Sequence, residues 1–170
     1  MKRTAIFAAL ILMAGFTFAQ RFAYIDSDYI MENIPEYKVA EQEIERISVE
    51  WQREIEQRFS EIDRLYREYQ AEAPLLPEEM RRQREENIIE RERLAKELQM
   101  RRFGREGDLF KKRQELIKPI QDRVYEAIEE IATRGNYAVI FDKSGGITMI
   151  FTDVRYDLSD EVLQRLGYRR

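Results

Sequence analysis

The residues best suited to chemistry in this sequence are two aspartates, Asp26 and Asp28, which flank Ser27 directly after an apolar segment. Two carboxylates in this position occur in enzymes that transfer phosphoryl groups with a bound metal ion. The rest of that pattern is missing, because Ile30 stands where a threonine is expected and no matching lysine and downstream acid pair follow. Acids are also common in turns after strands. We therefore interpret Asp26 and Asp28 as turn residues.

The composition removes most other routes to catalysis. The 170 residues include no cysteine and no histidine, so thiol nucleophiles, imidazole acid–base groups, and the usual zinc and haem ligands are absent. The sequence also has no glycine-rich phosphate loop followed by a lysine. We expect no enzyme here, with no catalytic residue, no metal ligand and no cofactor site.

The charge content indicates long solvated helices. Charged residues make up 36% of the chain, against roughly a quarter in an average soluble domain. Such a composition suits helices that bury only a narrow apolar seam. The net charge of −4 also disfavours a nucleic-acid partner, which needs a basic surface to neutralise phosphates.

Residues 1–19 have the organisation of an export signal. Lys2 and Arg3 precede an uncharged run from Ala5 to Phe18, and a small residue, Ala19, ends the segment. The run of about 14 residues is shorter than the roughly 20 that span a bilayer. We predict cleavage after Ala19, which leaves 27 basic and 33 acidic residues in a soluble product without disulfides. Its stability must then come from packing or assembly.

Two helices with a proline-rich tip between them are predicted for residues 35–134. A stripe of apolar residues spaced by three and four runs along residues 35–71, and a second stripe runs along residues 78–134. Pro74 and Pro77 interrupt the pattern near residues 72–77. The sequence therefore predicts an antiparallel helical hairpin, or coiled-coil arm, over residues 35–115.

Three residues are candidate hinges in the second helix. Pro119 lies where that helix passes the base of the hairpin, and a proline inside a helix bends it or loosens one turn. Gly104 and Gly107 weaken the helix further along the arm. Bending there and simple tolerance of glycine remain alternatives.

The two ends of the chain predict a small α+β body, made of residues 20–34 and 116–170. Residues 21–26 form one expected strand, and residues 137–142 and 147–152 form a β-hairpin around Gly145 and Gly146. A short helix is expected over residues 160–166. About 70 residues without disulfides are marginal alone, so we expect self-association through the strands. The candidate interface residues are Phe22, Tyr24, Ile25, Val139 and Phe141.

Five segments together resemble a known family. They are Phe22 to Ser27, Leu116 to Ile120, Val124 to Ala132, Gly135 to Asp142, and Asp157 to Leu163. In this order they resemble the Skp/OmpH family of periplasmic chaperones for outer-membrane proteins. The resemblance covers the whole mature chain, and its two ends carry most of the specificity.

The resemblance implies a homotrimer in the periplasm. Strands from each subunit would form a small β body, and three helical hairpins would project around a central cavity like tentacles. The cavity would hold unfolded outer-membrane β-barrel proteins without ATP and keep them from aggregating before membrane insertion. Well-known members are strongly basic, whereas this chain is acidic, so local basic patches and apolar contacts would have a larger share in client capture. Contact with lipopolysaccharide or a membrane surface stays open.

Six apolar residues of the arm are candidate client contacts. Leu75 and Leu76 lie at the tip, where no packing partner is evident from the sequence. The others are Trp51, Phe59, Tyr66 and Tyr69, for which packing in the helical seam is the alternative. A structural coiled-coil tether or spacer of the periplasm, without client binding, is the alternative for the whole protein.

Overall fold

The computed structural model describes residues 20–146 and 148–168. The predicted export signal, residues 1–19, lies outside the described residues. The chain divides into two compact units. We call residues 34–122 the arm unit, and the described residues up to Asn33 together with those from Arg123 onward the body unit. Helix α5, Asp108–Gly135, belongs to both.

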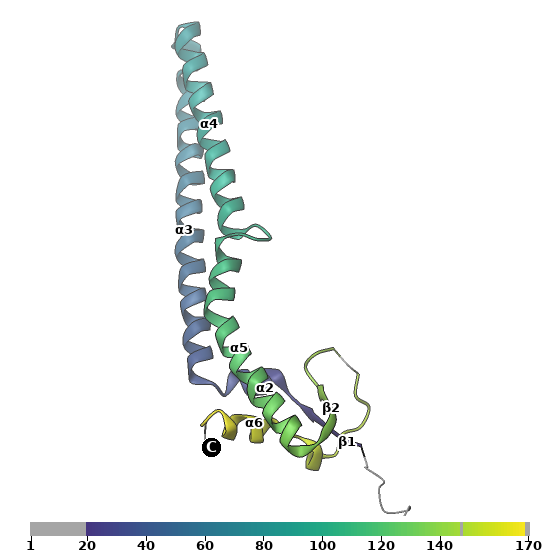
Figure 1. The fold of residues 1–170 in the computed structure, drawn as a ribbon. Coiled ribbons are helices and arrows are strands. Elements are labelled where there is room, and N and C mark those ends of the chain that lie inside the picture. The colour runs from purple at the N-terminus through teal and green to yellow at the C-terminus, as the bar shows by residue number, and fades with distance from the viewer. Residues whose placement is uncertain (1–19, 147, 169–170) are drawn as a thin grey trace, which may run out of the picture. The chain divides into compact units, whose positions relative to one another are not determined.

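The arm unit is an antiparallel helical hairpin, as predicted. Helix α3 (Pro35–Glu72) begins with a proline at its first position. Proline is well tolerated there, because a backbone amide at the start of a helix has no hydrogen-bond partner within the helix. A 3-10 turn, η1 (Ala73–Leu75), forms the tip, and helix α4 (Glu78–Phe103) runs back beside α3 (Figure 1). Glu78 and Glu79 stand in the first turn of α4, where acids favour the helix dipole.

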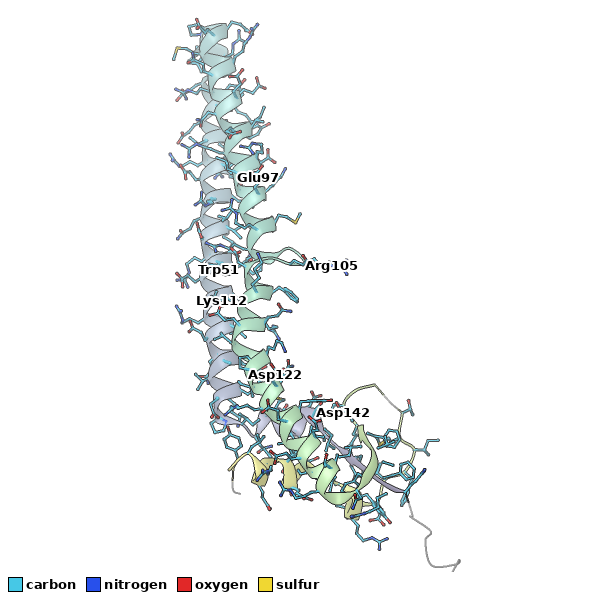
Figure 2. All side chains as sticks on the ribbon, in the orientation of Figure 1. Trp51, Glu97, Arg105, Lys112, Asp122 and Asp142 are labelled. Atoms are coloured by element: carbon cyan, nitrogen blue, oxygen red, sulfur yellow. The ribbon has the colours of Figure 1, made fainter. Side chains whose placement is uncertain are left out.

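The second helix of the hairpin is not continuous, so the prediction of one helix over residues 78–134 is wrong. Helix α4 ends at Phe103, and α5 begins at Asp108. The residues between them form a turn that projects from the hairpin, with Arg105 at its outer side (Figure 2). The turn needs its two glycines, since a Cβ at Gly104 would lie 2.3 Å from the carbonyl oxygen of Met100.

The apolar seam of the arm is narrow. Ile62, Ile88 and Ala95 form a buried cluster, against which Phe59, Leu65 and Tyr69 pack. The remaining surface of α3 and α4 is mostly charged and carries ion pairs three or four residues apart, such as Arg46 with Glu43 at 2.7 Å. This is the arrangement expected for a hairpin that is solvated on most of its circumference.

The body unit contains a two-stranded parallel sheet. Strand β1 (Arg21–Ile25) pairs with β2 (Tyr137–Asp142), with Ala23 opposite Ile140. Short helices α2 (Ser27–Glu32) and α6 (Ser159–Arg165) and the 3-10 turn η2 (Val154–Tyr156) complete it. The sequence analysis did not predict α2, because Asp26 and Asp28 were interpreted as turn residues.

The predicted β-hairpin is wrong. Residues 148–153 form no strand, although β2 agrees with its predicted bounds. The edge of β1 that faces away from β2 is contacted at one point. Asp157 forms an isolated β-bridge with Tyr24, and the Leu158 amide donates to the Tyr24 carbonyl at 2.9 Å. No described residue pairs with the outer edge of β2. The segment 148–153 therefore has strand-forming residues without a strand partner among the described residues.

Buried side chains of the body unit come from both ends of the chain. Ile30 in α2 and Val162 in α6 are fully buried, and Val124, Ala127 and Ile131 form a buried face of α5. By contrast, β2 has no fully buried residue. The protein is thus mostly helical, with long helices and a small parallel sheet. Among residues 20–146 and 148–168, no helix is both long and apolar enough to span a membrane.

Candidate functional site

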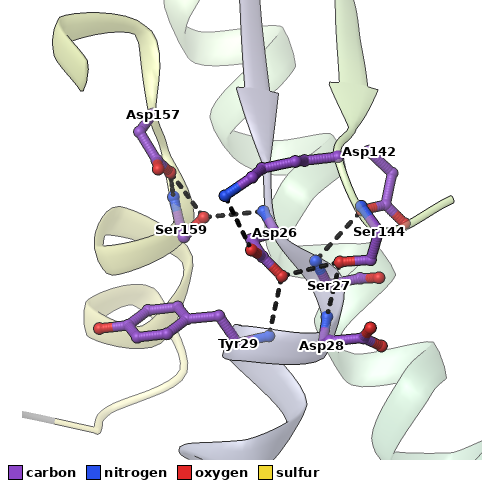
Figure 3. Close-up of polar contacts among 9 residues, drawn as sticks. Asp26, Ser27, Asp28, Tyr29, Asp142, Ser144, Asp157 and Ser159 are labelled. Carbon is purple, nitrogen blue, oxygen red and sulfur yellow. Dashed lines mark hydrogen bonds and ion pairs between the residues drawn. The ribbon is translucent and has the colours of Figure 1, made fainter. Parts of the chain in front are cut away.

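A polar network joins the ends of β1 and β2 to the start of α6 (Figure 3). At its centre is Asp26, which follows β1 and caps α2. Its Oδ1 accepts hydrogen bonds from the Tyr29 amide at 3.0 Å and from the Ser144 hydroxyl at 2.7 Å. Lys143 Nζ lies 3.4 Å from Asp26 Oδ2. The carboxylate is therefore bonded to groups of its own chain.

The electrostatics of Asp26 follow from these contacts. The hydrogen bonds from the Tyr29 amide and the Ser144 hydroxyl lower the pKa of the Asp26 carboxyl below its ordinary value, and Lys143 acts in the same direction. Partial burial opposes the shift. The group is therefore an anion at neutral pH that stabilises the fold.

Two further aspartates extend the network. Asp142 Oδ1 accepts from the amides of Ser27 at 3.1 Å and Ser144 at 3.0 Å. Asp157 Oδ1 accepts from the amide and the hydroxyl of Ser159, at 2.9 and 2.6 Å. The Ser159 hydroxyl in turn accepts from the Asp26 amide at 2.9 Å. These bonds fix the turns that follow the two strands.

This geometry supports a structural role for the Asp26 and Asp28 pair. The Asp28 side chain is exposed, and its amide donates to the Ser144 hydroxyl at 3.2 Å. Within the described part of the chain, no three aspartates or glutamates are grouped so that they could hold a metal ion. The hydrogen bonds of the network connect the turns after β1 and β2 to the start of α6, so these residues stabilise the body unit.

An apolar groove of about 770 Å³ lies on the body unit beside β1. Its walls include Phe22, Tyr24, Phe141, Met149, Phe151 and Tyr156. Two of these residues, Phe22 and Phe141, are 48% and 38% exposed. Aromatic side chains on an open surface are typical of an interface with another protein chain.

The segment after β2 is the most exposed apolar part of the body unit. Ile150 is 98% exposed, Phe151 85% and Val154 78%. Sequence reasoning did not name these residues as interface candidates, although it recognised residues 147–152 as strand-forming. The apolar run itself was the available signal, because exposed apolar side chains in sequence are typical of a surface that contacts another chain.

The five candidate interface residues fall into two groups. Phe22, Val139 and Phe141 are partly exposed on the body unit, where they can contact another chain. Tyr24 and Ile25 are only 8% and 5% exposed, and are buried by residues of their own chain. The first group is better placed for association, and the second belongs to the core of the unit.

The six candidate client contacts also differ in exposure. Phe59 and Tyr69 pack against the buried seam, and Leu76 is half-buried. Tyr66 is 51% exposed, and Leu75 at the tip is 86% exposed. One face of the remaining candidate, Trp51, is covered by the guanidinium of Arg102, which lies 4.2 Å from the ring centre.

The three candidate hinge residues lie in different settings. Gly104 and Gly107 belong to the turn that separates α4 from α5. Pro119 lies inside α5, and helix continues on both sides of it. A break in helical structure is therefore found at the glycines.

The family assignment comes from the sequence of nearly the whole chain. Residues 21–166 match the model of the family described as outer membrane protein (OmpH-like). The chain belongs to the OmpH-like family. Both units of this OmpH-like chain, including the polar network and the apolar groove, lie almost entirely within the matched residues.

Two OmpH-like comparisons extend over similar lengths. An uncharacterised protein from Aquifex aeolicus (strain VF5) is 25% identical over 160 residues, which cover 94% of each chain. The crystal structure of a candidate outer membrane chaperone (OmpH-like) from Caulobacter crescentus CB15 superposes with a TM-score of 0.70 at 10% identity. That alignment covers 89% of this chain and 86% of the other. The structural likeness shows a shared fold.

Proposed function

We propose that this protein is a periplasmic chaperone that binds unfolded outer-membrane β-barrel proteins and prevents their aggregation without ATP. Membership of the OmpH-like family supports this proposal, as does the fold shared with a candidate outer membrane chaperone. The N-terminal sequence supports export, with Lys2 and Arg3 before an apolar run. Such a holdase needs to bind the unfolded client better than the folded one, through many weak contacts.

The observation that carries the proposal is the exposure of large apolar side chains on both units. On the body unit, Ile150, Phe151 and Phe141 are exposed next to an apolar groove. On the arm unit, Leu75 is exposed at the tip. Apolar surface on an otherwise charged protein is typical of binding sites. We assign the surface on the body unit to a second copy of the chain and the surface on the arm unit to a client.

The body surface suits self-association as a homotrimer. The outer edge of β2 is unpaired among the described residues, and residues 148–153 carry apolar side chains without a strand partner. In an oligomer, the segment 148–153 of one subunit would cover the exposed apolar residues of the next, and it could add a strand to the edge of β2. Phe22, Val139 and Phe141 would be covered by the same contact.

The arm suits client binding through few apolar contacts on a charged surface. An unfolded barrel strand exposes apolar side chains and unpaired backbone groups. Leu75 and Tyr66 are the candidates with the greatest exposure. Because the chain has a net charge of −4, electrostatic attraction would come from local basic residues such as Arg101 and Arg105, which are exposed.

An aggregation assay tests the proposal. A urea-unfolded outer-membrane β-barrel protein is diluted into buffer with residues 20–170 of this chain and without ATP, and pelleted client is measured. We expect the client to stay soluble, and Leu75→Ser to protect less well than a matched change on the arm, Val49→Ser, at a residue that is 47% exposed. Precipitation of the client at every ratio would refute the holdase and favour a structural tether.

A further inference from the structure

The turn between α4 and α5 has a defined conformation. The Gly104 amide donates to the Met100 carbonyl at 2.8 Å, and the Gly107 amide donates to the Gly104 carbonyl at 2.9 Å. A Cβ at Gly107 would lie 2.7 Å from the Arg101 carbonyl oxygen and 2.9 Å from that of Arg102. Glycine is therefore required for close backbone packing at this position, which is itself buried.

Apolar packing is weak at the level of this turn. Ala95 and Ile117 are buried, but the sole buried residue between them is Gly107. On α3, Ile44 and Ile55 are buried, whereas the residues between them are half-buried or exposed. At the level of the break, the seam is therefore made of half-buried side chains, such as Trp51, Leu98 and Phe103.

Arg102 makes polar contacts to both neighbouring helices at this level. Its guanidinium lies 4.2 Å from the centre of the Trp51 ring on α3, and its Nη1 lies 2.9 Å from Asp108 Oδ2 on α5. Figure 2 shows Trp51 at the level of the projecting turn. Arg102 itself belongs to the last turn of α4. One side chain thus connects the three helical segments that meet here.

The ion pair of Arg102 with Asp108 is less exposed to water than a comparable pair elsewhere in the arm. The side chains of Arg102 and Asp108 are 27% and 30% exposed. An exposed counterpart is Arg91 with Glu61, which also joins α3 to α4 at 2.9 Å, but with side chains that are 45% and 48% exposed. Less water around a charge pair or a cation over a ring increases its strength. Both charges also interact favourably with the helix dipoles, because Arg102 lies in the last turn of α4 and Asp108 in the first turn of α5.

We propose that Arg102 is a latch that locks the break in the arm and covers the ring of Trp51. With Arg102 in place, α4 and α5 are held against α3 on both sides of the turn. When Arg102 leaves the ring, the segments are free to move about residues 104–107, and one face of Trp51 is exposed. The glycines therefore shape the turn, and Arg102 controls whether it bends. This inference concerns the free chain and does not depend on client binding.

Hydrogen exchange and tryptophan fluorescence on residues 20–170 test the latch, with Arg102→Met as the variant and Arg91→Met as the matched control. Trp51 is the only tryptophan in the sequence, so its emission reports this place alone. We expect Arg102→Met to speed amide exchange over residues 104–111 about tenfold and to make Trp51 more accessible to acrylamide. Arg91→Met should change neither. Equal effects of the two substitutions, or none from Arg102→Met, would overturn the proposal.

Two further variants separate the latch from a general loss of the hairpin. Asp108→Asn keeps Arg102 on the ring and removes the ion pair, so we expect a smaller change in the same direction, with the helical circular dichroism unchanged. Arg102→Lys keeps the charge but loses the planar group that stacks, and should lie between wild type and Arg102→Met. Should Asp108→Asn and Arg102→Lys both behave like wild type, the latch would be disproved.

Discussion

Replacing Phe151 with aspartate should dissociate the protein without unfolding a subunit. Phe151 is 85% exposed in the single chain, so its side chain contributes little to the stability of that chain. In the proposed trimer, the same side chain would be covered by a neighbouring subunit. The substitution therefore separates association from folding, which a change at a buried residue such as Tyr24 would not do.

The expected size of the effect follows from the exposed fraction. Covering a large apolar side chain contributes about 1.5–3 kcal/mol, so each Phe151 would contribute about 2 kcal/mol on association. A symmetric trimer buries three copies, about 6 kcal/mol, which corresponds to about a ten-thousandfold change in the association constant. The cost of desolvating three carboxylates adds to this value.

Sedimentation equilibrium across a dilution series measures the change. We expect wild type to sediment as a trimer and Phe151→Asp as a monomer, with equal helical content by circular dichroism. Leu75→Asp is the matched control, because Leu75 is 86% exposed but lies on the arm. It should remain trimeric. A Phe151→Asp protein that stays trimeric at every concentration would show that this segment is not at the interface.

Two substitution variants and one deletion test the interface, the polar network and the arm separately. The double change Val139→Asp and Phe141→Asp should both dissociate the trimer, measured by light scattering, and abolish client protection, measured by the aggregation assay. A trimer that stays intact would show that the interface does not include β2. Asp26→Asn should leave assembly and protection unchanged and lower the free energy of unfolding by about 1 kcal/mol at neutral pH. The pKa of Asp26 is lowered in the folded state. The stability difference between wild type and Asp26→Asn should therefore shrink as the pH falls below about 4 and through the folded-state pKa. Urea unfolding at several pH values measures this difference, and a difference that does not change with pH would contradict the proposed role of the network. Deleting residues 40–110 should leave an assembled body that no longer protects clients, and protection by the deletion variant would place client binding on the body.

Local sequence signals predicted the first helix of the arm well. Helix α3 runs from Pro35 to Glu72, close to the predicted 35–71, because a long apolar period and flanking prolines define a helix locally. The break at residues 104–107 was not predicted as a turn. Two glycines three residues apart lower helix stability, but their spacing alone does not indicate whether the helix bends, continues or ends there.

Long-range pairing limited the prediction of the body. The strands at residues 21–25 and 137–142 were recognised from their apolar residues, whereas their parallel pairing joins segments more than a hundred residues apart. The sequence therefore favoured a local hairpin with residues 147–152, whose described part, residues 148–152, forms no strand. The polar network shows the same limit, since nothing in the spacing of Asp26 and Ser144 indicates that their side chains meet.

The most direct test of the proposed function is the mass of residues 20–170 by light scattering, alone and with a urea-unfolded outer-membrane β-barrel protein diluted into buffer. The account predicts a trimer that takes up the client into one soluble complex, with the mass of three subunits and the client. A trimer that leaves the client to precipitate would contradict the holdase function, and a monomer would contradict the proposed assembly.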